Sequence, residues 1–152
     1  FVGDFCYNRE ALIKDGGFYN LPLAWGSDDI TACIAASKNG IANSQDICFQ
    51  YRKNRHTISN SANADLKIKA LLLQRKWYED FIARQNQTIE IESTMRYLLL
   101  QLLPQHFEFH NKIIIYDDLK INKCRLFHWL SRQRNLSLSK LQILKQFIKA
   151  IS

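Results

Sequence analysis

The spacing of the apolar residues changes at about position 64, and this change limits the folds open to the chain. Upstream, Ile47, Phe49 and Tyr51 alternate with other residues, which is typical of a strand. Downstream, apolar residues recur at helical steps of four, three, four and four: Leu66, Ala70, Leu73, Trp77 and Phe81. We therefore expect a mixed α/β domain over residues 1–60 and a mostly α-helical C-terminal extension over residues 61–152.

Local start and stop signals give these elements their expected bounds. In the first domain we expect a strand end at 1–7, a helix at 8–14 with Asn8 as N-cap, a helix from Ser27 to Gly40, and a strand within 41–51. In the second we expect helices at about 64–85, 90–103, 126–134 and 139–151. Residues 105–122 are ambiguous, because Ile113–Tyr116 could form a strand, but the helical neighbours favour a helix. Pro104 should end the helix at 90–103. The expected apolar stripe of the last helix is Leu141, Leu144, Ile148 and Ile151.

Positive charge is concentrated near the end of the chain, whose formal net charge is +7. No acidic residue follows Asp118, whereas eight basic ones do: Lys120, Lys123, Arg125, Arg132, Arg134, Lys140, Lys145 and Lys149. Such a block favours an anionic partner, either a membrane surface or nucleic acid. A solvated helix face is the simpler explanation of the same pattern.

A length of 152 residues suits one domain with a core, or half a domain with an appendage. Because the chain opens at Phe1, within an expected strand, we expect a piece of a longer protein. The chain has neither a leader-like segment nor an apolar run long enough to cross a bilayer, which predicts a soluble protein. Its four cysteines form no Cys-x-x-Cys pair, which favours buried, reduced thiols in a cytoplasmic protein.

Two adjacent carboxylates, Asp28 and Asp29, follow Ser27 at the start of an expected helix. Ser27 is a suitable N-cap, and the helix dipole stabilises acidic side chains in the first turn. Helix stability alone therefore explains the pair, and any further role depends on the residues around it.

Four residue groups around this pair are more specific in their order and spacing than any one of them is alone. They are Phe1–Leu12, Gly16-Gly17-Phe18, Gly26–Thr31 with Gly40 eleven residues after Asp29, and Tyr51-Arg52 with Ile58-Ser59. Together they resemble the C-terminal, acceptor-side half of the catalytic domain in family-2 glycosyltransferases, over residues 1–85. The resemblance implies an α/β portion of the GT-A fold, with few strands and short helices, and inverting transfer of a sugar from a nucleotide-sugar donor.

The resemblance also implies roles for single residues. Asp29 would be the general base that takes the proton of the acceptor hydroxyl, while Asp28 would bind the acceptor or hold the base. Four further residues are expected to bind substrate: Trp25, Asp4, Arg52 and His56. A sugar ring could pack on the tryptophan, and cations could meet the diphosphate. The alternatives are a core tryptophan, a turn aspartate and a solvated basic loop, and His56 could instead bind a metal.

The sequence departs from the family in two respects. Its acidic pair is Asp-Asp rather than Glu-Asp, which shortens the first carboxylate. The Asp-x-Asp that holds the metal and the sugar diphosphate is absent, and Asp117-Asp118 lies among expected helices. We therefore expect the nucleotide-sugar donor and a divalent metal, Mg or Mn, to bind mainly to a missing N-terminal half. The 152 residues alone are then expected to be inactive.

The expected acceptor is a sugar or a lipid-linked glycan of polysaccharide biosynthesis. This implies a cytoplasmic enzyme, peripheral at the inner face of the cell membrane, with the basic C-terminal helices on an anionic membrane surface or simply packed on the catalytic domain. Nucleic acid is not an expected partner of such an enzyme. It belongs to the alternative function, a non-enzymatic basic helical module that binds nucleic acid or an anionic membrane surface.

A small hydrolase is a third hypothesis, for which the chain offers no nucleophile. His106 and His110 suit one helix face, but their order with Glu108 is not that of a zinc protease.

Overall fold

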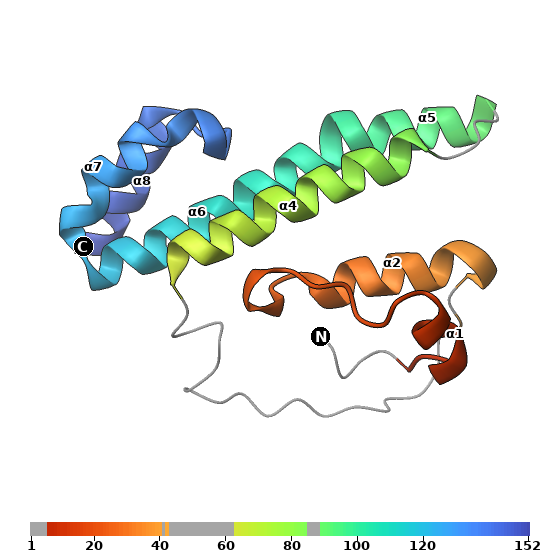
Figure 1. Ribbon diagram of the computed structural model, residues 1–152. Coiled ribbons are helices and arrows are strands. Elements are labelled where there is room, and N and C mark those ends of the chain that lie inside the picture. The colour runs from red at the N-terminus through yellow and green to blue at the C-terminus, as the bar shows by residue number, and fades with distance from the viewer. Residues whose placement is uncertain (1–5, 41, 43–62, 85–88) are drawn as a thin grey trace.

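The computed structural model describes residues 6–40, 42, 63–84 and 89–152, and every regular element in these ranges is helical (Figure 1). The α-helices are α1 (Arg9–Lys14), α2 (Ser27–Asn39), α4 (Ala64–Ala83), α5 (Ile89–Tyr97), α6 (Leu103–Ile121), α7 (Leu126–Ser131) and α8 (Lys140–Ile151). Short 3₁₀ helices form η2 (Pro22–Ala24), η4 (Lys123–Arg125) and η5 (Gln133–Leu136). A π-helical turn, η3 (Leu98–Leu102), joins α5 to α6.

The expected α/β architecture, a few-stranded portion of a GT-A-like domain, is wrong for the described residues, which form an all-α structure without strands. Of the two expected strands, Cys6 and Tyr7 are described and belong to neither a helix nor a strand. The alternating residues of 41–51 lie outside the described residues, apart from Ala42. The first domain, where it is described, therefore consists of α1, η2, α2 and their connections.

Capping signals placed α1 and the end of α2 correctly. The Asn8 side chain accepts a hydrogen bond from the Ala11 N–H at 3.0 Å, so Asn8 is the N-cap of α1. After α1 the chain turns at Gly16, whose φ of +92° suits a residue without Cβ. Gly40 closes α2 with φ +75°, and its N–H donates to the Ala36 carbonyl.

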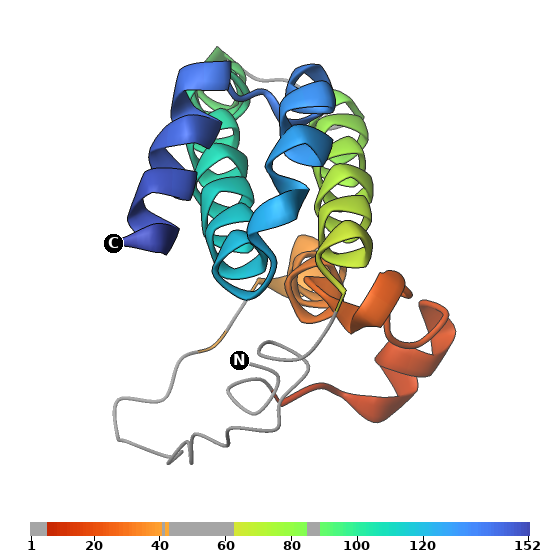
Figure 2. The same ribbon diagram turned by 90° about the vertical axis from the view of Figure 1, so that its left-hand side faces the viewer.

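The two long helices, α4 and α6, lie side by side in both views (Figures 1 and 2). Helices α7 and α8 cover one end of this pair, and α6 lies between α8 and α4 (Figure 2). Helix α2 lies along α4 on another side, preceded by η2, which contacts α4 directly. The α4–α6 pair therefore forms the body of the molecule, against which η2 and α2 pack on one side and α7 and α8 pack at one end.

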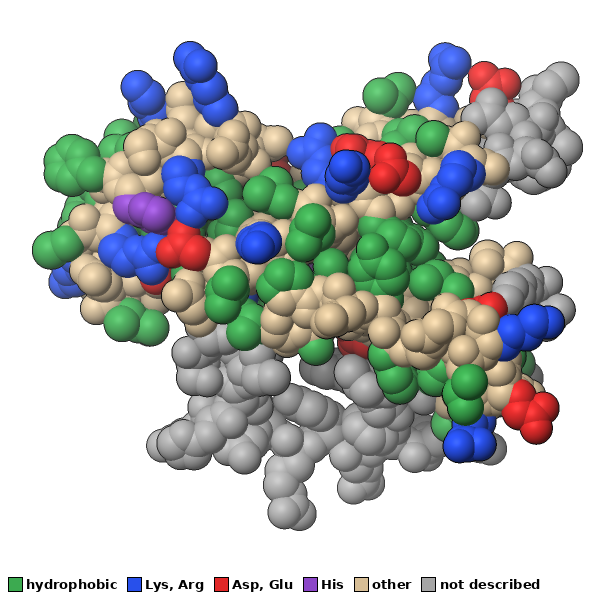
Figure 3. Space-filling model, in the orientation of Figure 1, with side chains coloured by type: hydrophobic (Ala, Val, Ile, Leu, Met, Phe, Trp, Pro, Cys, Tyr) green, Lys and Arg blue, Asp and Glu red, His purple; other side chains and the backbone are tan. Residues whose placement is uncertain are grey.

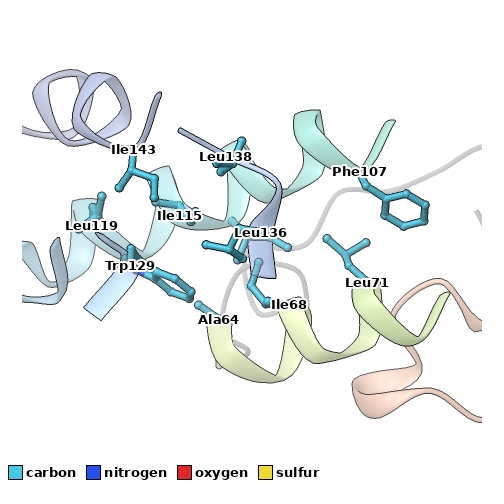
Figure 4. Close-up of a cluster of buried hydrophobic side chains, with 11 residues drawn as sticks. Ala64, Ile68, Leu71, Phe107, Ile115, Leu119, Trp129, Leu136, Leu138 and Ile143 are labelled. Atoms are coloured by element: carbon cyan, nitrogen blue, oxygen red, sulfur yellow. The ribbon is translucent and has the colours of Figure 1, made fainter. Parts of the chain in front are cut away.

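The main hydrophobic core fills the space between α4, α6, α7 and α8 (Figure 4). Its most deeply buried side chains are Ile68, Ile115, Leu119, Trp129, Leu136 and Ile143. Complete burial of each such side chain contributes about 1.5–3 kcal/mol, so this core dominates the stability of the C-terminal part. A smaller cluster of Leu21, Ile30 and Ala70 joins α2 to α4.

Helix α4 lies where the sequence predicts it, but part of its buried face differs from the predicted stripe. Leu66 and Leu73 are 40% and 43% exposed, whereas Ile68 and Leu71 are buried. The reason is that α4 is apolar on more than one side, because it contacts α6 on one side and η2 and α2 on another. The spacing of apolar residues shows that a helix has an apolar face, but for a helix with two apolar faces it does not show which one is more deeply buried.

The expected stop at Pro104 is also wrong, because α6 begins at Leu103 and continues through the proline. Proline at the second position of a helix is tolerated, since the first N–H groups have no partner within the helix. The preceding π turn, in which the Leu103 N–H donates to the Leu98 carbonyl, lets the chain enter α6 without a break. Residues 105–121, where the sequence favours a helix over a strand, belong to helix α6, so this prediction is confirmed.

A charged cluster closes the end of the α4–α6 pair where α7 lies, and basic, acidic and histidine side chains gather there in Figure 3. Asp65 of α4 accepts hydrogen bonds from Arg125 and Arg132, and its Oδ1 lies 2.9 Å from His128 Nε2. Asp118 of α6 accepts from Trp129 Nε1 at 2.7 Å and from Arg125 at 3.0 Å. The cluster thus ties α4, α6 and α7 together, and the Asp118 carboxylate serves as an acceptor at the edge of the core.

The described cysteines are free thiols, but their expected burial is wrong at two positions. Cys6 and Cys124 are exposed, and Cys33 of α2 is half-buried. Cys48 lies outside the described residues.

Candidate functional site around Asp29

The chain enters α2 through a strained turn. Leu23 and Ala24 have φ values of +60° and +53°, which non-glycine residues adopt rarely and at a cost of about 1–2 kcal/mol each. Gly26 follows with φ +78°, a conformation that glycine adopts freely. Strain of this kind persists where packing holds it, and it is more frequent at functional sites. The turn therefore makes the start of α2 a candidate functional site.

Two hydroxyl groups hold this turn against α2. The Leu21 N–H donates to Ser27 Oγ at 3.1 Å, and the Tyr19 N–H donates to Thr31 Oγ1 at 3.0 Å. The Thr31 hydroxyl in turn donates to the Ser27 carbonyl at 2.6 Å. Ser27 was expected to be the N-cap of α2, but it is the first residue of the helix and Gly26 occupies the cap position. Ser27 instead binds the loop before the helix, because its hydroxyl is occupied by Leu21.

The acidic pair lies in the first turn of α2, as predicted. Asp28 is half-buried and Asp29 is exposed. The Nε2 of Gln74, a side chain of α4 that is only 2% exposed, donates to Asp29 Oδ2 at 3.2 Å. The other oxygen, Oδ1, has no hydrogen-bond partner among the described residues. Gln74 therefore holds Oδ2 of Asp29 in place, and Oδ1 is available to a ligand.

Gly26 allows Gln74 to reach this position. A Cβ added to Gly26 would lie 2.6–2.7 Å from the Nε2, Cδ and Oε1 atoms of Gln74, which is closer than real Cβ contacts allow. The glycine is needed for both the positive φ and the approach of the buried amide. The glycine before the acidic pair and the glutamine on α4 thus form one unit with Asp29.

The charge of Asp29 affects the pKa values of Tyr78, Cys33 and His110. Burial, with smaller effects from Cys33 and Asp29, raises the pKa of Tyr78 far above its ordinary value. Burial also raises the pKa of the Cys33 thiol, which hydrogen-bonds with Tyr78. On α6, burial and the neighbouring His106 lower the pKa of His110, although the charge of Asp29 opposes this. At neutral pH the phenol, the thiol and the imidazole are therefore uncharged, and none of them forms an ion pair with Asp29.

Trp25 contributes to packing. It is half-buried and packs against both hydrophobic clusters, so it links α2 to the body of the molecule. The ammonium group of Lys67 lies 4.9 Å from the centre of its ring, which places a cation over one face of the indole. That face is not available for a sugar ring to stack on.

The remaining predicted residues are not brought into this site by the described structure. Asp4, Arg52 and His56 lie outside the described residues. Within the described ranges no group of three or more His, Cys, Asp or Glu side chains could hold a metal ion. The residues in hand therefore do not fit the metal that the resemblance implies.

Sequence reasoning missed Gln74, the hydrogen-bond partner of Asp29, and also Tyr78 and His110, whose pKa values the charge of Asp29 affects. Gln74 carries no signal of burial in the sequence, since it directly follows the apolar run Ala70–Leu73 and precedes the polar residues Arg75 and Lys76. His110 gave no functional signal in the sequence beyond sharing an expected helix face with His106. Its ring centre lies 4.5 Å from that of His106, and the charge of Asp29 on α2 raises its pKa against the larger effects of burial and His106.

Comparisons of the chain with protein-family models, with curated proteins and with solved structures gave no match. None of the described helices combines the length and the hydropathy that a crossing of the membrane requires.

Proposed function

We propose that this chain supplies the acceptor-side base of an inverting glycosyltransferase that uses a nucleotide-sugar donor. The observation that carries the proposal is the geometry of Asp29, an exposed carboxylate at a helix start with Oδ2 held by the buried amide of Gln74 and Oδ1 unpartnered among the described residues. A general base needs this combination of fixed position and free lone pairs. The glycine, the acidic pair and the helix-ending Gly40 supply the supporting sequence pattern.

In the proposed reaction Asp29 takes the proton of the acceptor hydroxyl while the hydroxyl oxygen forms a bond to the anomeric carbon. The bond from that carbon to the diphosphate oxygen breaks, and the nucleoside diphosphate leaves with the electron pair. Asp28, in the same helical turn, lies next to the base and would bind a second hydroxyl of the acceptor. The side chains of Tyr78 and His110 are neutral, and within the described part of the chain Asp29 forms no ion pair with a cation.

The donor must be bound by other residues in this proposal. The sequence has no Asp-x-Asp, and the described residues offer no metal cluster. We therefore propose that the nucleotide sugar and any Mg or Mn ion bind to a part of the enzyme outside these 152 residues, and that these residues alone do not turn over. The acceptor is then a sugar or a lipid-linked glycan in the cytoplasm, at the inner face of the membrane.

The test uses the enzyme as its source cell makes it, with radiolabelled UDP-sugars as donors and a lipid extract of the same cells as acceptor. Asp29→Asn should lower kcat by about 100-fold or more, because a general base contributes about 10²–10⁴ to the rate, and should leave UDP affinity unchanged. Asp28→Asn should instead raise the acceptor KM. Glu10→Gln, an exposed acid of α1, is the control and should behave as wild type. Normal turnover by Asp29→Asn, or full activity of the 152 residues alone, would overturn the proposal.

A further inference from the structure

Helix α8 carries an apolar stripe that the fold leaves uncovered. The four residues of the predicted apolar stripe are all exposed: Leu141 (62%), Leu144 (38%), Ile148 (60%) and Ile151 (48%). The helix packs instead through Ile143, which is fully buried, with Phe147 and Ala150 beside it. Helix α8 is therefore apolar on two sides, only one of which faces the core.

The uncovered stripe lies at the outside of the molecule. Helix α8 is at an outer edge of the fold, with α6 between it and α4 (Figure 2). A capping box, in which Ser139 and Gln142 bind each other's backbone N–H groups, fixes the start of the helix. The stripe is thus presented on a well-formed helix of 12 residues.

Positive charge accompanies the stripe without nearby compensation. Lys140, Lys145 and Lys149 lie on the same helix, all of them exposed. No acidic residue follows Asp118 in the chain. The acidic side chain that α8 does contact, Glu108 of α6, already accepts hydrogen bonds from Lys112 and Gln142. The surface of α8 therefore combines apolar side chains with unneutralised ammonium groups.

We infer that α8 lies flat on an anionic lipid surface, with the four stripe residues in the acyl boundary and the lysines at the headgroups. This combination is that of an interfacial amphipathic helix. Pairing with a second copy through α8 would bring like charges together, and nucleic acid would leave the apolar stripe without a partner. An anionic membrane offers acyl chains to the apolar stripe and negative headgroups to the lysines. This inference does not rest on the proposed transferase activity, so its failure would leave the role of Asp29 untouched.

The test is co-sedimentation of the chain with vesicles of phosphatidylcholine alone, or of phosphatidylcholine and phosphatidylglycerol in equal parts. We expect binding to the anionic vesicles that weakens with added salt. Leu144→Ser with Ile148→Ser should abolish it, and Lys145→Gln with Lys149→Gln should weaken it by about fivefold for each lysine. Leu72→Ser with Leu73→Ser on α4 is the matched control for lost exposed apolar area, and Lys69→Gln with Lys76→Gln is the control for lost charge.

Circular dichroism should show that all the variants are folded. No binding to anionic vesicles, or equal loss in the α4 controls, would overturn the inference. So would self-association in size-exclusion chromatography that Leu144→Ser with Ile148→Ser abolishes. Oligonucleotide binding that depends on the lysines but not on the stripe would also overturn it.

Discussion

Substitution of Gly26 by alanine tests the unit formed by Gly26, Gln74 and Asp29. The new methyl group would be placed 2.6 Å from Gln74 Nε2, and the backbone would keep a φ of +78° that alanine disfavours. Two separate costs follow, one from the backbone and one from the contact. The buried amide would have to move away from Asp29 to relieve the contact.

Gly16→Ala separates these costs, because Gly16 has a similar φ of +92° but nothing within 4 Å of a built Cβ. In the left-handed conformation, alanine lowers the free energy of unfolding by about 1–2 kcal/mol relative to glycine. Alanine also makes the unfolded chain less flexible, which raises the free energy of unfolding by about 0.4–1 kcal/mol. Gly16→Ala should therefore lower the free energy of unfolding by about 1 kcal/mol. Gly26→Ala adds an overpacking cost of about 1–3 kcal/mol, for a total of about 2–4 kcal/mol.

The assay is urea unfolding at 25 °C, followed by circular dichroism, of the two glycine variants, Gln74→Ala and the double variant Gly26→Ala with Gln74→Ala. Truncation of Gln74 removes the atoms that the methyl group would meet. The double variant should therefore be more stable than the sum of the single effects predicts. Equal losses for Gly26→Ala and Gly16→Ala, together with additive effects in the cycle, would refute the close approach of Gln74 to Gly26.

Two further predictions concern the C-terminal part. Burial raises the pKa of Asp65, but hydrogen bonds from Arg125 and His128 outweigh it, so the net shift is downward from 3.8. This stabilisation is present above pH 3.8 and is lost as the pH falls through the lowered pKa. Asp65→Asn should lower the free energy of unfolding by about 1–2 kcal/mol near pH 6. In urea titrations the difference in free energy of unfolding between wild type and variant should shrink below pH 3.8, and a difference that stays constant with pH would contradict this. Ser139→Ala removes the capping box with Gln142 and should cost about 1 kcal/mol, whereas an unchanged urea midpoint would show that the cap contributes nothing.

Local signals predicted local structure well. Asn8 and the glycines at 16 and 40 fixed where α1 begins and where α1 and α2 end, because caps depend on a few neighbouring residues. The expectation that a helix ends at Pro104 was wrong, because the sequence does not show that a π turn precedes the proline. The alternation of Ile47, Phe49 and Tyr51 lies outside the described residues, so that strand stays a prediction.

Tertiary contacts were less accessible to sequence reasoning. The stripe from Leu141 to Ile151 was correctly read as helical, but its exposure depends on where α6 lies. The position of Asp29 at a helix start was predicted, whereas its contact with Gln74 joins residues 45 positions apart. Such a contact follows from the packing of α2 on α4, which periodicity does not specify.

The π turn at Leu98–Leu102 has a consequence for insertions and deletions in this chain. A π turn holds one residue more than an α-helical turn, so α5 and α6 differ in phase by one residue. Deletion of one residue there would restore a regular helix and rotate every side chain of α5 by about 100° relative to α6. Homologues that lack this residue should therefore carry a different set of apolar positions before Leu98, while the positions after Pro104 stay the same.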